Sequence, residues 1–171
     1  MAVVIVPDKN LTLTDESEIK SYLASINIDY ERWENLKNIS ADASEDEILA
    51  AYTDEIEKLK KSGGYVTADV INIVPETANL ETMLNKFRPE HWHDEDEVRF
   101  IVKGCGIFHI APENGDVVAV KMTSGDLIRV PKGTKHWFDL DENKTVRAIR
   151  LFQDVSGWMP HYTESGREKH Y

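Results

Sequence analysis

The chain has 171 residues, of which 41% are hydrophobic and 30% are charged, with 9 glycines and 6 prolines. This length suits a single domain spanning residues 1–171, and this composition excludes collagen-like, low-complexity and wholly disordered chains. The formal net charge of −11 repels phosphate backbones and anionic lipids, and the sequence shows no basic patch. We therefore expect no nucleic-acid partner and no membrane partner.

Cys105 is the only cysteine. An intramolecular disulfide and a cysteine-based zinc cluster are thereby excluded, which favours a reducing compartment. The apolar N-terminal residues lack a basic flank and are interrupted at Pro7, which is not typical of a signal peptide. Every apolar run is far shorter than the roughly 20 residues that cross a bilayer. We expect a cytoplasmic protein that is a monomer.

The first part of the chain, residues 1–64, is expected to form a helical layer. Residues 14–26 place apolar side chains at helical spacing, with Thr14 as the expected N-cap and acidic residues in the first turn. This pattern predicts a short amphipathic helix.

A stronger helical pattern spans residues 44–62. Ser44 and Glu47 have the spacing of a capping box, and Gly63 is the expected C-terminal stop. The i,i+4 spacing also predicts two ion pairs, Asp54 with Lys58 and Glu57 with Lys61. We expect one continuous helix here.

A third short helix is expected over residues 80–87, with Thr77 as its cap, and it ends before Pro89. The remaining pattern is typical of β-strands separated by turn sequences such as Asn114-Gly115. The predicted strands are 65–74, 98–103, 106–111, 117–122, 127–130, 134–140 and 145–152. Short strands at this spacing predict a mainly β fold, a sandwich or barrel with a core over residues 65–160. Residues 161–171 show no periodicity and are expected to be a tail that lies on the surface or is disordered.

Two histidines lie two residues apart, at His91 and His93, and Glu97 follows four residues later. On a strand, side chains at i and i+2 share a face, so both imidazoles can converge on one cation. A third imidazole, His136, follows a turn that ends at Gly133, and a barrel would bring these strands together. Such a set suits Fe(II), Ni(II), Mn(II), copper or zinc, and an octahedral ion would keep two open positions. Taken alone, the His-x-His tripeptide is more typical of a surface or core pair.

The surrounding spacing changes that interpretation, because it resembles the cupin superfamily. The first cupin motif, G(x)5HxH(x)3,4E(x)6G, is matched by the histidine pair, the glutamate and Gly104, with Asn85 in place of the opening glycine. The second motif, G(x)5PxG(x)2H(x)3N, is matched from Gly125 to His136, with Leu140 in place of the closing asparagine. The resemblance implies a cupin β-barrel, or jelly roll, with several α-helices in the N-terminal half.

Within the cupin superfamily, the sequence around these motifs resembles the acireductone dioxygenase family. The stretches that carry the likeness are Phe87 to Phe100, Gly104 to Phe108, Ser124 to Ile128, Lys135 to Phe138 and Arg150 to Phe152. The resemblance implies that the metal ligands are His91, His93, Glu97 and His136, and that the cofactor is Fe(II) or Ni(II), one ion per chain. It implies an acireductone, 1,2-dihydroxy-3-keto-5-methylthiopentene, as the substrate and O2 as the cosubstrate. The products implied are formate and 2-keto-4-methylthiobutyrate with iron, or formate, carbon monoxide and 3-methylthiopropionate with nickel.

Residues beside the ligands have expected roles in that chemistry. Arg99 lies two positions after Glu97 and therefore on the same strand face. As a catalytic and substrate-binding residue, its guanidinium can bind and stabilise an enediolate. The alternative for Arg99 is a surface ion pair. Phe138 should face the cavity and pack the substrate chain, or serve only the core. Glu90 and Asp96 are candidates for orienting an imidazole N–H or taking a substrate proton, although a solvated acid is the more typical interpretation at a strand end.

Other histidines receive a structural interpretation. His109 is expected to have a structural role on its strand, and His161 and His170 are expected to be exposed in the tail. Two further functions remain open for a cupin with this ligand set. One is another metal-dependent cupin enzyme, an isomerase or a quercetinase-like dioxygenase, and the other is a non-catalytic cupin that binds a metal or small ligand.

Overall fold

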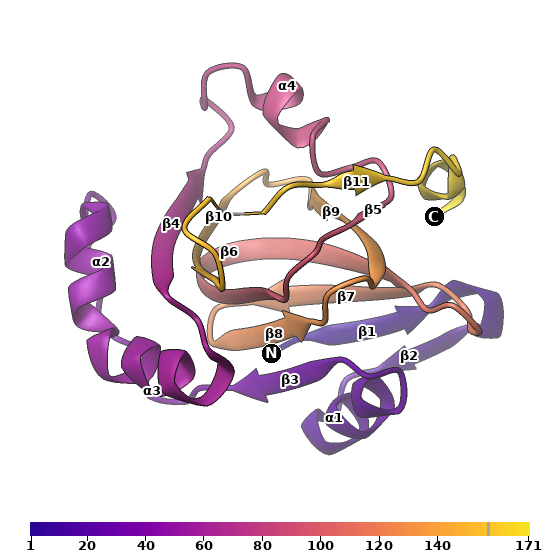
Figure 1. Cartoon of the computed structure of the whole chain (residues 1–171), viewed down its shortest axis with the longest axis horizontal. Helices are drawn as coiled ribbons and strands as arrows, with labels where there is room; N and C mark the ends of the chain where they lie inside the picture. The colour runs from indigo at the N-terminus through magenta and orange to yellow at the C-terminus, as the bar shows by residue number, and fades with distance from the viewer. Residues whose placement is uncertain (157) are drawn as a thin grey trace.

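The computed structural model describes residues 1–156 and 158–171, and these residues form two antiparallel sheets with helices on the outside (Figure 1). The strands of the first sheet follow the order β11-β5-β9-β6-β7-β1-β2, and those of the second follow β4-β10-β6-β8-β3. The described strands are β1 Val3–Val6, β2 Leu11–Leu13, β3 Asp29–Arg32, β4 Thr67–Ile73, β5 His91–Trp92, β6 Glu97–Ala111, β7 Val118–Thr123, β8 Asp126–Val130, β9 Lys135–Leu140, β10 Val146–Phe152 and β11 His161–Tyr162. The mainly β fold expected from the sequence is confirmed.

Strand β6 belongs to both sheets and joins them. Its first half pairs with β8 and β10, and its second half pairs with β7 and β9. Two separate strands were expected here, but Gly104 lets one strand bend, because its φ of +81° is open to glycine at little cost. The register against β10 also shifts beside this point, as at a β-bulge.

The alternation of side chains along β6 explains why its first half is buried on both faces. Val98, Phe100 and Val102 pack beneath the helices, while Ile101 joins the core between the sheets. Glu97 and Arg99, which alternate with these side chains, are also buried, so both faces of this half of β6 are covered although its sequence includes two charged residues.

Helices α2 (Glu45–Ala51) and α3 (Thr53–Gly63) cover the outer face of the second sheet, as Figure 1 shows beside β4. The expected single helix is therefore divided at Tyr52, where φ is −108°. The Ser44 capping box is confirmed. Helix α3 ends at Gly63, but the residue that caps it with left-handed backbone is Gly64, with a φ of +70°. Neither predicted i,i+4 ion pair is observed among the described residues; Lys60 instead pairs with Glu57.

The other two helices are shorter than expected. Helix α1 (Glu16–Ser25) is capped by Asp15 rather than Thr14, because the Asp15 carboxylate accepts hydrogen bonds from the Ser17 and Glu18 amides. Helix α4 (Leu80–Leu84) starts after Asn79, and the expected cap Thr77 instead accepts from the Val74 amide. Short 3-10 helices η1 (Pro7–Lys9) and η2 (Arg167–His170) complete the elements. Among the described residues, no helix has the length and apolarity needed to span a membrane.

The N-terminal part is not only helical, which corrects the expected helical layer over residues 1–64. Strands β1 and β2 extend the first sheet beyond β7, and β3 extends the second sheet beyond β8. Strand β1 buries Val4 and Val6 in the same core cluster as Phe108 and Val120. The N-terminal residues are therefore part of the barrel core.

Candidate metal centre

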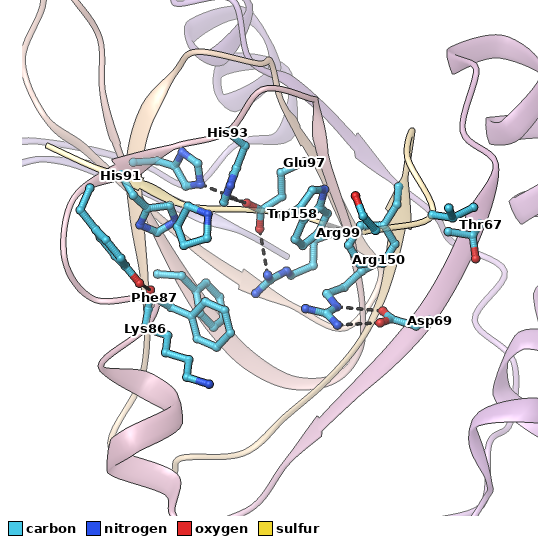
Figure 2. Close-up of a pocket in the computed structure, with 17 residues that line it drawn as sticks. Thr67, Asp69, Lys86, Phe87, His91, His93, Glu97, Arg99, Arg150 and Trp158 are labelled. Carbon is cyan, nitrogen blue, oxygen red and sulfur yellow. Dashed lines mark hydrogen bonds and ion pairs between the residues drawn. The ribbon is translucent and has the colours of Figure 1, made fainter.

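Three imidazoles meet at one end of the barrel, inside a cavity of about 430 Å³ (Figure 2). His91 lies on β5, His93 follows that strand, and His136 lies on β9, where it is the direct cross-strand partner of His91. All three side chains are buried, and one ligand atom from each lies within 4.8 Å of the others. The structure thus brings together the three histidines that the sequence singled out.

Each ring is oriented by a backbone carbonyl. Nδ1 of His91, His93 and His136 lies 2.7, 3.1 and 2.8 Å from the carbonyl oxygens of Pro89, Met159 and Thr134 respectively. A carbonyl only accepts, so each Nδ1 carries the proton and donates. Each neutral ring then has its lone pair on Nε2, which is the arrangement that metal-binding imidazoles adopt.

Glu97 adds a carboxylate to this cluster from the start of β6. Its Oε2 lies 3.1 Å from Nε2 of His93 and 3.0 Å from Nε2 of His136. When the rings are neutral, these nitrogens and the carboxylate oxygen are all acceptors, and a cation between them, a metal ion or an added proton, satisfies them. Three imidazoles and one carboxylate fit a divalent transition metal.

The electrostatics of the cluster agree with a site for a cation. Burial, followed by the charge of His136, lowers the pKa of His91 to about 4. Burial also acts to lower the pKa of His93, but the hydrogen bond and charge of Glu97 outweigh it and raise that pKa. Burial acts to raise the pKa of Glu97, yet Arg99 and the two imidazoles hold it well below its usual value. The carboxylate therefore stays ionised.

Arg99 is the buried cation of the cavity. Its Nη2 donates to Oε1 of Glu97 at 2.8 Å, while its Nε and Nη1 have no hydrogen-bond partner among the described residues. The guanidinium carbon lies 4.5 Å from the centre of the Phe138 ring and 5.1 Å from that of Phe108. Burial lowers the pKa of Arg99 to about 10, which leaves it charged at neutral pH. It is not the surface ion pair considered as an alternative.

A second arginine, Arg150, lines the cavity beside Arg99, its cross-strand partner on β6. Asp69 on β4 accepts from Arg150 Nε at 2.8 Å and from Nη2 at 2.6 Å, a bidentate pair visible in Figure 2. Sequence reasoning did not assign a role to either residue. The alternation of β10 could have placed Arg150 on the same face as Phe152, but the pairing of β4 with β10 is a long-range register that the sequence does not reveal.

Aromatic side chains form the apolar walls of the cavity. Phe138 lines it as expected, and Phe87, Phe152, Trp158 and Tyr162 join it. The Trp158 ring lies 4.4 Å from that of Phe152, and its Nε1 donates to the Asp96 carbonyl at 3.2 Å.

Glu90 and Asp96 do not occupy the expected positions beside an imidazole. The Asp96 carboxylate accepts from the Lys132 amide at 3.0 Å. The Glu90 carboxylate accepts from hydroxyl groups of the C-terminal residues. The imidazole N–H groups are bound by backbone carbonyls instead, so a role of either carboxylate in orienting an imidazole directly is wrong.

The remaining histidines lie outside the cluster. His109 is stacked on Trp137 with ring centroids 5.0 Å apart, in agreement with its structural interpretation. His161 is not simply exposed, since its Nε2 lies 2.6 Å from the Asp94 carboxylate and its ring stacks on Trp92. His170 is exposed, as expected.

Comparisons with known proteins agree on one family. Residues 3–160 match the model of the ARD/ARD' family. The chain is 43% identical over 171 residues to an acireductone dioxygenase of Picosynechococcus sp., covering 100% of this chain and 97% of that protein. It is 44% identical over 151 residues to an acireductone dioxygenase of Pseudomonas aeruginosa, covering 88% and 83% of the two chains.

A solved structure has the same fold. It is an acireductone dioxygenase from Bacillus anthracis with a cadmium ion in its active centre, which superposes with a TM-score of 0.87 and 36% identity over 95% of this chain and 98% of that one. The family model covers most of the chain and the relatives are similar over nearly their whole length. The chain therefore belongs to the ARD/ARD' family of acireductone dioxygenases.

Proposed function

We propose that the protein is a metal-dependent acireductone dioxygenase that cleaves 1,2-dihydroxy-3-keto-5-methylthiopentene with O2 in methionine salvage. The observation that carries this proposal is the buried His91–His93–His136 cluster, with Glu97 at its edge. Beside it lie two donors of Arg99 that have no partner in the part of the chain that the structure describes. Membership of the family supplies the substrate class. The cavity of about 430 Å³ offers room for a molecule of this size.

In this proposal, His91, His93, Glu97 and His136 hold one Fe(II) or Ni(II) ion. When bound, this cation would act as a Lewis acid and template for an electron-rich enediolate. The carbonyl contacts of the three rings engage their Nδ1 atoms, which leaves each Nε2 to bind the cation. The imidazole ligand atoms are thus in position before the cation binds.

Arg99 binds the substrate through Nε and Nη1, the two donors without a hydrogen-bond partner in residues 1–156 and 158–171. These N–H groups are fixed by the contact of Nη2 with Glu97, so they stabilise negative charge on the enediolate without reorganising. Arg99 with Glu97 and Arg150 with Asp69 are neutral pairs. A divalent cation therefore leaves a net positive cavity that complements a dianion.

The aromatic walls hold the methylthio end of the substrate and exclude water from the reacting carbons. Phe138 serves both purposes, because it packs against the Arg99 guanidinium and lines the cavity. With Fe(II) the products are formate and 2-keto-4-methylthiobutyrate; with Ni(II) they are formate, carbon monoxide and 3-methylthiopropionate. The bound ion, rather than any difference in the chain, selects between these outcomes.

The decisive experiment is reconstitution of metal-free protein with Fe(II) or Ni(II), followed by addition of the acireductone in air and product analysis. Formation of formate with either metal, and of carbon monoxide with nickel alone, is expected. No formate with either metal would overturn the proposal, and turnover of a flavonol or a sugar instead would indicate another cupin enzyme. Metal analysis of protein purified from its own cells identifies the ion in use.

We also propose that residues 1–171 act as one domain, as a monomer in the cytoplasm. Support for one domain comes from the core cluster, which joins Val4 of β1 and Ile19 of α1 to Phe108 of β6. Cys105, the one cysteine of the sequence, is buried and free, which suits a reducing compartment. Sedimentation of the purified protein tests the oligomeric state.

A further inference from the structure

The C-terminal residues form a strap, defined here as residues 158–167, that lies along one wall of the metal centre. Figure 1 shows this yellow segment passing beside β5 before the chain ends. Its strand β11 pairs with β5, with His161 opposite Trp92 and Tyr162 opposite the ligand His91. The strap is therefore paired with the strand that carries a ligand, which agrees with the expected tail on the surface and not with a disordered one.

The strap also orients a ligand. The carbonyl of Met159 is the acceptor for Nδ1 of His93 at 3.1 Å, whereas the acceptors for the other two rings, Pro89 and Thr134, lie only two residues before those rings. The Nδ1 contact of His93 thus bridges 66 residues of sequence. The position of Met159 depends on whatever holds the strap in place.

Glu90 holds the strap from a buried position. Its side chain is only 1% exposed, and Oε1 accepts from the Thr163 hydroxyl at 2.7 Å and from the Ser165 hydroxyl at 2.9 Å. Arg167 places its Nε 3.2 Å from Oε2. The Thr163 amide also donates to the Glu90 carbonyl at 3.0 Å. A buried carboxylate needs such partners, and those found among the described residues all belong to the strap.

We propose that Glu90 is a positioning residue that clamps the strap and, through the Met159 carbonyl, fixes the orientation of His93 and the retention of the metal ion. The inference rests on the metal centre of the proposed function. Loosening the clamp moves the acceptor of Nδ1, so His93 loses its fixed ring orientation and binds a cation more weakly. Contacts of this kind around a metal ligand typically change metal affinity by about 10- to 100-fold.

The test is the rate at which Ni(II) leaves the loaded protein when a chelator is added in excess. Glu90→Ala is expected to increase this rate constant about tenfold, and Glu90→Gln less, because its amide oxygen still accepts from the two hydroxyl groups. Hydrogen exchange measured by mass spectrometry is expected to become faster at residues 159–165 of the metal-free variants.

Arg167→Ala keeps the inference testable if Glu90→Ala does not fold, since the Arg167 side chain is partly exposed. It is expected to increase Ni(II) release by about two- to fivefold, in line with a partly exposed ion pair. Lys169→Ala is the matched control: it removes the same charge from the same 3-10 helix, η2, and the Lys169 side chain has no ion-pair partner among the described residues. This control should release nickel at the wild-type rate.

Two outcomes would overturn the inference. One is nickel release from folded Glu90→Ala and Arg167→Ala at the wild-type rate; the other is unchanged exchange of the strap amides in both variants. These measurements need only metal and chelator. A protein that fails to turn over the acireductone but shows the predicted release rates would contradict the proposed substrate and leave the clamp intact.

Discussion

Glu97 and Arg99 form an ion pair in which both side chains are almost fully buried, with Nη2 of the arginine 2.8 Å from Oε1 of the glutamate. The second oxygen of Glu97 faces His93 and His136. One carboxylate thus connects the candidate metal ligands to the cation that would bind substrate. Because the two residues are two positions apart on β6, the pleat of the strand alone places them on one face.

Removing the arginine should separate metal binding from turnover. Arg99→Ala is expected to keep the metal, because the three imidazoles remain, and to lower kcat/KM by about 100- to 1,000-fold through loss of fixed donors to the enediolate. Arg99→Lys should retain the charge but not the forked geometry and give an intermediate value. Metal analysis and steady-state kinetics check both. Arg129→Ala, which removes a partly exposed arginine of β8, is the control. Unchanged kinetics in Arg99→Ala would contradict the assignment of Arg99 as a substrate-binding residue.

Loss of one imidazole should remove the metal itself. His93→Ala is expected to lower affinity for Ni(II) by about 100-fold or more, since it deletes a donor nitrogen rather than a supporting contact. His170→Ala removes an exposed histidine outside the site and should bind metal as the wild type does. Equilibrium titration against a chelator of known affinity measures both. Full nickel binding by His93→Ala would show that the ligand set is wrong.

The sequence predicted the histidine cluster well because the positions of these histidines follow from patterns between residues close in the chain. His91 and His93 share a face by strand periodicity, and the turn that ends at Gly133 places His136 at the start of a strand. The bidentate pair of Arg150 with Asp69 could not be predicted in the same way. It depends on the register of β4 against β10, which joins residues 81 positions apart.

Strand β3 of the N-terminal part was missed for a related reason. Strand β3 has the sequence Asp-Tyr-Glu-Arg, and of these only Tyr30 is buried, so no alternation is visible. It pairs with β8 at the edge of its sheet. Its Tyr30 hydroxyl donates to the buried Asp126 carboxylate at 2.7 Å. Tertiary contacts of this kind outweigh the weak strand propensity of the segment.

The bend of β6 at Gly104 should be sensitive to any side chain. A Cβ added there would lie 2.1 Å from the Thr145 carbonyl oxygen, and φ is +81°. Gly104→Ala is therefore expected to lower the free energy of unfolding by about 2–3 kcal/mol or more. Gly115→Ala is the matched control, because its added Cβ would have ordinary contacts, 3.4 Å or longer, at a backbone without positive φ. Urea unfolding of both variants measures the difference, and equal stability would show that β6 can bend elsewhere.

Cys105 should make the stability of the protein depend on pH in the alkaline range. Burial, with a further contribution from the charge of Asp141, raises the pKa of the thiol from 9.0 to about 11. Below pH 9 the thiol is neutral in both the folded and unfolded states. Between pH 9 and about 11 the unfolded chain loses this proton while the folded chain keeps it, so this contribution to stability falls as pH rises.

Tyrosine and lysine side chains titrate in the same pH range, so the wild type is compared with Cys105→Ala. Between pH 8 and pH 10.5, urea unfolding should show a larger decrease in the free energy of unfolding for the wild type than for the variant. At pH 8, the thiol of the native protein should react with a disulfide reagent far more slowly than the thiol of the unfolded protein. Parallel pH profiles for the two proteins, together with rapid native modification, would show that the thiol is not protected by burial.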